Sequence, residues 1–556
     1  PNQYKVFQLQ TEGLHAYLAS QNAVSMGLYF PLPDGQLELF QVKQTSNLHP
    51  DLARKYPSIK SFEGYRVADA SDKIRVSIDQ NGLHGIFTVK GEEVYIDPYA
   101  ENQKDHYISY FTKDYEVAPE IREQYAKNHQ EQHAAQASST TYEIDPTTFG
   151  GKNSPFTKNQ STTRDLRVYR FALAVTGEYT QRHGGTVEGA LAAMNVALDR
   201  INFVLENDVA VRLELVANND EVIFIDPETD PYTDPDVGPA ATTNVDVLNS
   251  RIGIDNYDVG HVFTTFCPSG AAGVSIRPSS VVGTVCLSQF NGASYKGRAS
   301  SCEVATTDRF YIGIICHELG HQFSAEHTWN NCPTVEDQNQ FSFNTAYEPG
   351  GGVTIMSYGR ACGSQSYGEE FYYHNNSIES ILTYSREGTG STCGVSLPTE
   401  NNIPTIDIAL ENGFFIPINT PFELSAEAND LDGDVLTYSW EQYDLDFNTS
   451  DIGEPVGNEP TFRSQKPTTS PTRTFPEIRT ILNNRNDPVE VLPTYARDLT
   501  FRCTVRDNNP EAGAVAWDEV AFRSDETSGP FRVTYPNDLN IELEAGSYQE
   551  ITWDVA

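Results

Sequence analysis

Alternation of apolar and polar residues near the N-terminus predicts a set of short β-strands. Residues 74–78 and 85–89 alternate in this way, and residues 79–82 (DQNG) between them are typical of a hairpin turn. Residues 93–98 form a further candidate strand. We therefore predict a β-rich unit over residues 1–115, in which no catalytic cluster stands out.

The middle of the chain alternates candidate strands with candidate helices, a pattern typical of an α/β domain. The strands are predicted at residues 167–175, 211–215, 221–225 and 257–265, and the helices at residues 186–205 and 377–382. The acidic, proline-rich residues 226–236 are predicted to be a loop. Either residues 257–265 or the glycine-rich stretch 271–287 could be an edge strand that takes an extended peptide. We place this domain at residues 166–396.

Strict alternation returns beyond residue 401 and predicts an all-β region. Residues 421–426, 436–441 and 498–505 each alternate apolar with polar side chains, which is typical of a β-sandwich. We place this sandwich at residues 397–527. The pattern begins again at residues 528–556, which we interpret as the start of a further β domain that is truncated here.

A polar stretch at residues 116–165 separates the first two regions and is rich in Gln, Thr, Ser and Asn. Residues 120–136 within it have some helical character. Because proteases cut mobile polar linkers, we interpret the stretch as a linker or activation segment. Arg164-Asp165, or a basic residue nearby, is a candidate processing point.

Charge and hydropathy exclude some partners. The 556 residues include 77 acidic and only 38 basic side chains, so nucleic acid and anionic membranes are poor partners. No apolar run reaches the roughly 18 residues that a membrane-spanning helix needs. The chain begins at Pro1 without a signal-peptide pattern, so we expect that a leader has been removed or is not part of this sequence.

All eight cysteines follow residue 266, and seven of them lie between residues 267 and 393. They lack paired Cys-x-x-Cys spacing, which argues against a structural zinc knot. Disulfides in a secreted protein are the better interpretation, although seven cysteines leave at least one without a local partner.

The strongest chemical signal is the stretch at residues 316–327 (CHELGHQFSAEH). His317 and His321 are four residues apart, so on a helix both imidazoles lie on one face and can bind the same metal ion. Glu318 is rotated by about 100° from His317, which suits a base for water better than a third ligand.

A third ligand is available in His327, provided that the helix ends near Ser324 and the chain turns back. Three nitrogens and one open position are the layout of a catalytic zinc site. An amphipathic helix with two buried histidines would be the structural alternative. His327 and the later stretch 355–358 (IMSY), which follows a glycine-rich turn, argue against that alternative.

A second candidate metal site lies in the C-terminal region. Asp430, Asp432 and Asp434 surround a Gly turn and could supply oxygen ligands to calcium. A plain Asp/Gly turn explains the same residues equally well.

In order and spacing, these motifs resemble the metzincin metallopeptidases, whose consensus is His-Glu-x-x-His-x-x-Gly-x-x-His followed by a Met-turn. Residues 317–323 (HELGHQF) and 327–330 (HTWN) resemble the secreted bacterial reprolysin-like proteases more closely. Residues 62–64 (FEG) and 95–98 (YIDP) resemble the pro-domain of these proteases. The C-terminal strands resemble the immunoglobulin-like domains that often follow the catalytic domain.

The resemblance implies a β-rich pro-domain, an α/β metzincin domain with a twisted mixed sheet, an active-site helix and a Met-turn, and a C-terminal β-sandwich. It implies a secreted, monomeric bacterial zinc endopeptidase of the EC 3.4.24 class, made as a zymogen. Its substrates would be extended polypeptides, and its own pro-domain would inhibit it. His317, His321 and His327 would hold one Zn²⁺, Glu318 would be the general base, and Met356 would lie beneath the metal.

Two departures from the family pattern matter. Ser324 stands where the family has Gly, at a left-handed turn that costs a non-Gly residue roughly 1–2 kcal/mol. The pro-segment has no cysteine, so a thiolate cannot block the zinc, and another group such as a carboxylate would have to do so. Tyr358 resembles the Tyr of the Met-x-Tyr sequence in astacin-like and serralysin-like enzymes, where it stabilises the oxyanion; an ordinary buried Tyr is the alternative.

Two alternatives remain open at this point, one for the function and one for the metal. The protein could be an adhesin or binding protein whose protease-like domain is catalytically impaired, which Ser324 and the β-sandwich would allow. A divalent ion other than zinc could also occupy the three-histidine site.

Overall fold

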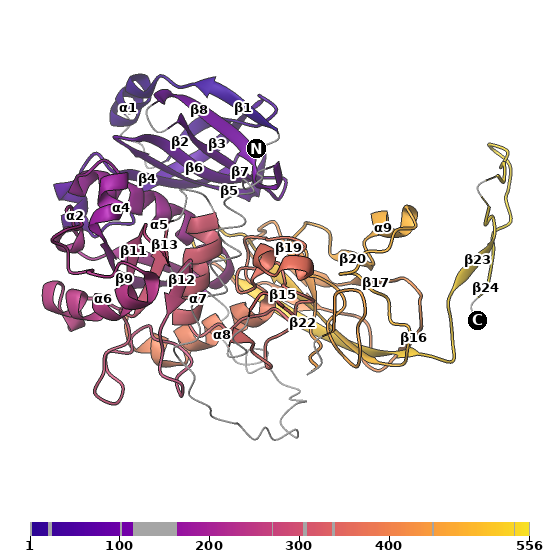
Figure 1. Cartoon of the computed structure of the whole chain (residues 1–556). Helices are drawn as coiled ribbons and strands as arrows, with labels where there is room; N and C mark the ends of the chain where they lie inside the picture. The colour runs from indigo at the N-terminus through magenta and orange to yellow at the C-terminus, as the bar shows by residue number, and fades with distance from the viewer. Residues whose placement is uncertain are drawn as a thin grey trace.

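The computed structural model describes residues 3–554 apart from residues 21–24, 101–102, 115–163, 269–270, 304–308, 336–339, 447–449 and 539. Figure 1 shows an N-terminal sheet lying on a central α/β region, with the C-terminal strands beside that region. The hairpin of β23 (Arg532–Tyr535) and β24 (Thr552–Asp554) projects away from the rest. None of the described helices combines the length and apolar character that crossing a bilayer requires.

The N-terminal region is a single antiparallel sheet of eight strands in the order β1-β8-β7-β6-β5-β4-β3-β2. Its strands are β1 (Tyr4–Gln8), β2 (Met26–Pro31), β3 (Leu37–Thr45), β4 (Lys60–Arg66), β5 (Asp69–Asp79), β6 (Gly82–Val89), β7 (Glu92–Ala100) and β8 (Gln103–Phe111). Two helices, α1 (Thr11–Ser20) and α2 (Pro50–Lys55), accompany the sheet. The β-rich unit and its β5–β6 hairpin are thus confirmed.

Side-chain alternation gives this sheet two different faces. Along β5, Ile74, Val76 and Ile78 pack into the sheet's own apolar core. Arg75 and Ser77 point to the other face, where they bond to side chains of the central region. The alternation that predicted the strand therefore also separates a core face from a docking face.

The central region is built on a twisted sheet in the order β10-β9-β11-β13-β12, with β14 also pairing with β9. Its strands are β9 (Leu166–Val175), β10 (Val211–Leu215), β11 (Val259–Thr264), β12 (Gly273–Ser275), β13 (Ala299–Cys302) and β14 (Val395–Leu397). Strands β12 and β14 pair antiparallel to their neighbours and the other pairs are parallel. The sheet is therefore mixed, as expected.

Helices cover both faces of this sheet. Phe171 and Leu173 of β9 pack with α5 (Val187–Val209), whereas Ala172 of the same strand packs on the opposite side with α6 (Val237–Arg251). The hydroxyl oxygen of Thr186 accepts a hydrogen bond from the Gly189 N–H (3.0 Å) and caps α5. Further helices of this region are α4 (Gly177–Arg182), the π-helix η7 (Arg309–Cys316), α7 (His317–Gln322) and α8 (Asn375–Arg386), and short 3-10 helices accompany them.

The sequence-based expectations for this region and for the linker before it need correction or qualification at four points. The strand predicted at residues 221–225 is wrong, because the 3-10 helix η5 (Asn219–Val222) stands there and only Ile223 makes a bridge, to Val175. Helix α6 was not predicted, since its sequence is rich in Thr and Asn and lacks a strong apolar period. The helical stretch at 120–136 lies outside the described residues. Arg164 is only 6% exposed, which disfavours cleavage at that residue in this state.

The C-terminal region is β-rich, as predicted, and the immunoglobulin-like sandwich stays a prediction. Strands β16, β22, β21 and β19 form its main sheet, and β15–β18 and β17–β20 pair beside it. The strands are β15 (Thr405–Asp407), β16 (Phe415–Pro417), β17 (Phe422–Ser425), β18 (Glu427–Asn429), β19 (Thr437–Gln442), β20 (Thr472–Phe475), β21 (Asp498–Arg506) and β22 (Val515–Asp525), with a short helix α9 (Ile478–Leu482).

Three disulfides cross-link the described part of the central region. They join Cys267 to Cys302, Cys286 to Cys393, and Cys332 to Cys362. Cys316 and Cys503 are buried free thiols, so one of the seven clustered cysteines is indeed left unpaired.

Candidate metal centre

The histidine helix ends where the ligand geometry requires it to end. Helix α7 stops at Gln322, and Ser324 adopts φ +86°, in the left-handed region. The Ala325 N–H then donates to the Gly320 carbonyl oxygen (2.8 Å), which closes the turn. The turn brings His327 back to the face that carries His317 and His321.

The three imidazoles converge through their Nε2 atoms. The Nε2–Nε2 distances are 3.2 Å from His317 to His321, 3.2 Å from His317 to His327 and 3.1 Å from His321 to His327. Tetrahedral zinc with Zn–N bonds of about 2.0–2.1 Å would separate two ligand nitrogens by roughly 3.3–3.4 Å. The spacing therefore fits one small ion held by all three rings.

Hydrogen bonds to backbone carbonyl groups fix the tautomer of every ring. Nδ1 lies 2.7 Å from the Ile355 oxygen in His317, 2.8 Å from the Ala325 oxygen in His321, and 2.6 Å from the Gln340 oxygen in His327. Because a carbonyl oxygen only accepts, each Nδ1 carries the proton, and each neutral ring presents an Nε2 lone pair. Three lone pairs that face one another cannot bond among themselves. A bound cation would accept all three lone pairs.

Burial keeps these rings neutral. It lowers the pKa of His317 to about 4, and burial together with the neighbouring imidazoles lowers the pKa values of His321 and His327 well below the usual range. Neutral imidazole is the form that binds a metal ion.

Met356 packs against the histidine helix at Gly320, and its assignment to a Met-turn stays a prediction. Its side chain is fully buried, and a Cβ added to Gly320 would lie only 2.3 Å from the Met356 sulfur. Gly320, between the two helical histidines, is therefore required by this close approach.

Glu348 is a residue of the site that sequence reasoning missed. Its carboxylate is 0% exposed. One oxygen accepts hydrogen bonds from the hydroxyl groups of Thr328 (2.6 Å) and Thr354, and the other accepts from the N–H groups of Val353 (2.7 Å) and Thr354 (3.1 Å). Glu348 thus ties the residue that follows His327 to the segment that leads into the Met-turn. In the sequence it stands before Pro-Gly-Gly, and nothing there distinguishes it from a turn residue.

Glu318 lies beside the edge strand of the sheet. It is 7% exposed, and burial raises the pKa of its carboxyl to about 8. A Cβ added to Gly273 of β12 would lie 2.6 Å from the Glu318 Oε1 atom. Within the described residues β12 is the outer strand and β11 is interior, so stretch 271–287, not 257–265, supplies the edge next to Glu318.

The remaining candidate residues are also brought to defined places. The Tyr358 ring centroid lies 4.6 Å from that of His327, and its hydroxyl donates to Gln340 Oε1 (2.8 Å). The carboxylates of Asp430, Asp432 and Asp434 offer oxygens within 4.8 Å of one another. The oxyanion role of Tyr358 and calcium binding by the aspartates stay predictions.

The strained turn at Ser324 gives a prediction of its own. Ser324→Gly should raise the free energy of unfolding by about 1 kcal/mol, because relief of the left-handed strain exceeds the extra backbone entropy that glycine loses. Chemical denaturation of both proteins, loaded with zinc, measures the difference. Ser324→Ala, which keeps the Cβ, should give no gain; equal stability of the serine and glycine forms would show that the turn is unstrained.

Comparison with known families agrees with this geometry. Residues 165–385 match the Metallo-peptidase family M12B Reprolysin-like. No curated protein matches the chain. The matched segment spans strands β9 to β13, the histidine helix and Met356, so fold and site together define a metzincin-like metallopeptidase. Within this class, residues 165–385 are similar to the reprolysin-like family, and this similarity and the three histidines together imply zinc as the metal.

Proposed function

We propose that the protein is a secreted zinc-dependent endopeptidase of the EC 3.4.24 class, made as a monomeric zymogen. The observation that carries this proposal is the convergence of three Nε2 lone pairs, which lie 3.1–3.2 Å from one another. Three disulfides fit an extracellular protein. The intact set of three histidines and Glu318 disfavours the alternative of an impaired protease-like binding protein.

The residues of the site have separate tasks in this proposal. His317, His321 and His327 hold zinc, which when bound polarises the scissile carbonyl group and makes water a better nucleophile. Glu318 accepts the proton of the attacking water and returns it to the leaving amine. The edge strand β12 offers backbone groups to an extended substrate.

Tyr358 and the three aspartates have subsidiary roles in the proposal. Tyr358 turns its hydroxyl from Gln340 towards the developing oxyanion, which its place beside His327 allows. Asp430, Asp432 and Asp434 bind calcium and brace the C-terminal region.

The N-terminal region would be the pro-domain that keeps the enzyme latent. In the part of it that the structure describes, no side chain is hydrogen-bonded to the three histidines, whose partners all lie in residues 317–355. The described N-terminal sheet therefore does not act as a metal ligand in this proposal.

Casein digestion tests the function. Protein that has been cut between residues 114 and 164 and freed of its N-terminal region should digest casein. A zinc chelator should stop the digestion, and added Zn²⁺ should restore it. Equal digestion with and without chelator would overturn the zinc mechanism, and a zinc-loaded but inert protein would favour the binding-protein alternative.

A further inference from the structure

One face of helix α5 carries a polar stripe that the N-terminal sheet covers. The stripe consists of Asn195, Asp199, Asn202 and Glu206, spaced by four, three and four residues, so all four lie on the same side of the helix. They are between 0% and 8% exposed. We call these four residues the α5 stripe. A helix that served only to complete the central core would have apolar residues at such buried positions.

The partners of the first two stripe residues all come from the N-terminal region. Asp199 accepts hydrogen bonds from Asn47 (2.8 Å), Ser61 (2.7 Å), Arg75 (3.1 Å) and Ser77. Asn195, one turn earlier, bonds to Asn47, Ser61 and Ser77 as well. Neither side chain has a hydrogen-bond partner in its own region among the described residues. Their placement is explained only by the sheet that lies on them.

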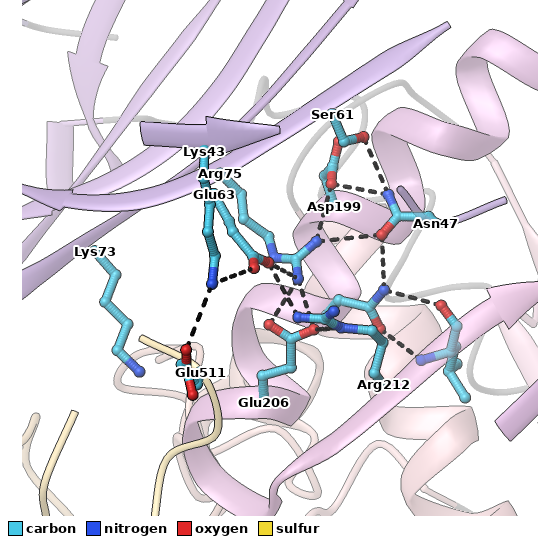
Figure 2. Close-up of polar contacts among 12 residues, drawn as sticks. Lys43, Asn47, Ser61, Glu63, Lys73, Arg75, Asp199, Glu206, Arg212 and Glu511 are labelled. Atoms are coloured by element: carbon cyan, nitrogen blue, oxygen red, sulfur yellow. Dashed lines mark hydrogen bonds and ion pairs between the residues drawn. The ribbon is translucent and has the colours of Figure 1, made fainter. Parts of the chain in front are cut away.

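Arg75 is the centre of the contact (Figure 2). Its guanidinium is 2% exposed and lies within 3.1 Å of three carboxylates. Asp199 and Glu206 (2.6 Å) belong to α5, and Glu63 (3.0 Å) belongs to the neighbouring strand β4. Arg212 of β10 pairs in turn with Glu63 (3.0 Å) and Glu206. Asp199, Glu206 and Arg212 give the central side of this network a net charge of −1. On the sheet side, Arg75 and Lys43, which lies 3.6 Å from Glu63, outweigh the Glu63 carboxylate and give +1.

Two further contacts hold the sheet in the same place. Residues 47–49 extend the central sheet beyond β10, because the Leu215 N–H donates to the Asn47 carbonyl oxygen (2.7 Å) and the His49 N–H donates to the Leu215 oxygen (2.9 Å). Figure 2 also shows Lys43 and Lys73 reaching towards the C-terminal region. Lys43 lies 3.8 Å from Glu511, and the Lys73 ammonium donates to the Asn509 oxygen (2.8 Å).

We propose that the α5 stripe is a docking surface for the N-terminal region as a separate polypeptide, which stays bound after the connecting segment is cut. The N-terminal sheet has its own apolar core, so it does not depend on α5 for its interior. Both surfaces that meet at Arg75 are polar, and water can solvate each of them after separation. Apolar contacts flank this centre through Leu48, Leu52 and Ile86, which adds affinity.

Docking and proteolysis are independent in this proposal. The stripe binds through carboxylate and amide groups of α5, none of which is a zinc-site residue. Binding of the cut fragments can therefore be measured in a Glu318→Gln background, which prevents self-digestion. If the docking proposal fails, the proposed peptidase activity is not affected. If the peptidase proposal fails, the docking proposal is not affected.

The test uses the full chain with the recognition sequence of an added site-specific protease placed between residues 114 and 164. After complete cutting, the two pieces should co-elute in size-exclusion chromatography at micromolar concentration. Arg75→Met should weaken their association at least about 100-fold, because removing one partner leaves buried carboxylates uncompensated. Asp199→Asn should act in the same direction while leaving the N-terminal sequence unchanged.

Arg54→Met is the matched control, since Arg54 is exposed and pairs with Asp51 of its own helix α2. Its cut pieces should co-elute like those of the parent. Separation of the parent pieces at micromolar concentration would overturn the proposal. So would co-elution of both the Arg75 and the Asp199 variants at parental affinity. If Arg75→Met does not fold, Asp199→Asn alone decides, because it replaces one oxygen by an NH₂ group.

Discussion

Replacement of Glu318 by glutamine should abolish peptide hydrolysis while zinc remains bound. Glutamine has nearly the same size but cannot accept a proton at neutral pH, so the attacking water keeps its proton and the leaving amine receives none. Loss of a general acid–base group costs about 10²–10⁴-fold in rate. Glu318 is not among the three residues whose ligand atoms converge, so the metal content should stay near one equivalent.

The measurement pairs a peptide-cleavage rate with zinc content and thermal unfolding on the same preparation. Glu387→Gln is a matched control, because Glu387 is an exposed residue at the end of α8 and its loss should change neither rate nor zinc. Retained cleavage by the Glu318→Gln variant would show that Glu318 is not the general base. Loss of zinc together with activity would mean instead that the carboxylate supports the metal.

The site was predictable where local spacing determines geometry. Two histidines four residues apart must share a helical face, and a third histidine six residues later can join them only if the helix ends. Ser324 at φ +86° is that end. The residues that support the ligands were not predictable, because Glu348 is connected to Thr328 and Thr354 by the folded chain and not by any period in the sequence.

The elements of the fold were likewise predictable only where the sequence has a clear period. Strand β9 and helix α5 were predicted close to their observed bounds, whereas the strands predicted at 74–78 and 85–89 lie inside the longer β5 and β6. Helix α6 has no such period, and its packing against Ala172 and Val262 on the second face of the sheet is what stabilises it. Nothing in the sequence indicates that another region covers the polar α5 stripe. Only the docked sheet shows that these side chains are buried.

Glu348→Ala should weaken zinc binding by about 10–100-fold, the effect typical of removing a group that orients metal ligands. The change leaves two buried N–H groups and two buried hydroxyl groups without their acceptor. Each such group costs about 1–3 kcal/mol if it stays unsatisfied, so the loop should rearrange. That rearrangement would move the Ile355 carbonyl group, which holds the His317 ring, and would loosen the loop that carries His327.

Glu348→Gln separates hydrogen bonding from charge at the same position. Its amide oxygen can accept from the two backbone N–H groups, and its NH₂ group can donate to the two hydroxyl groups, which rotate to accept. Zinc affinity in this variant should therefore stay within a few-fold of the parent, as judged by competition with a chelating dye. Glu387→Ala serves as the surface control. Parental zinc affinity in Glu348→Ala would show that the loop holds His327 and the Met-turn without the buried carboxylate. Equal losses in the alanine and glutamine forms would show instead that the negative charge of Glu348 matters more than its hydrogen bonds.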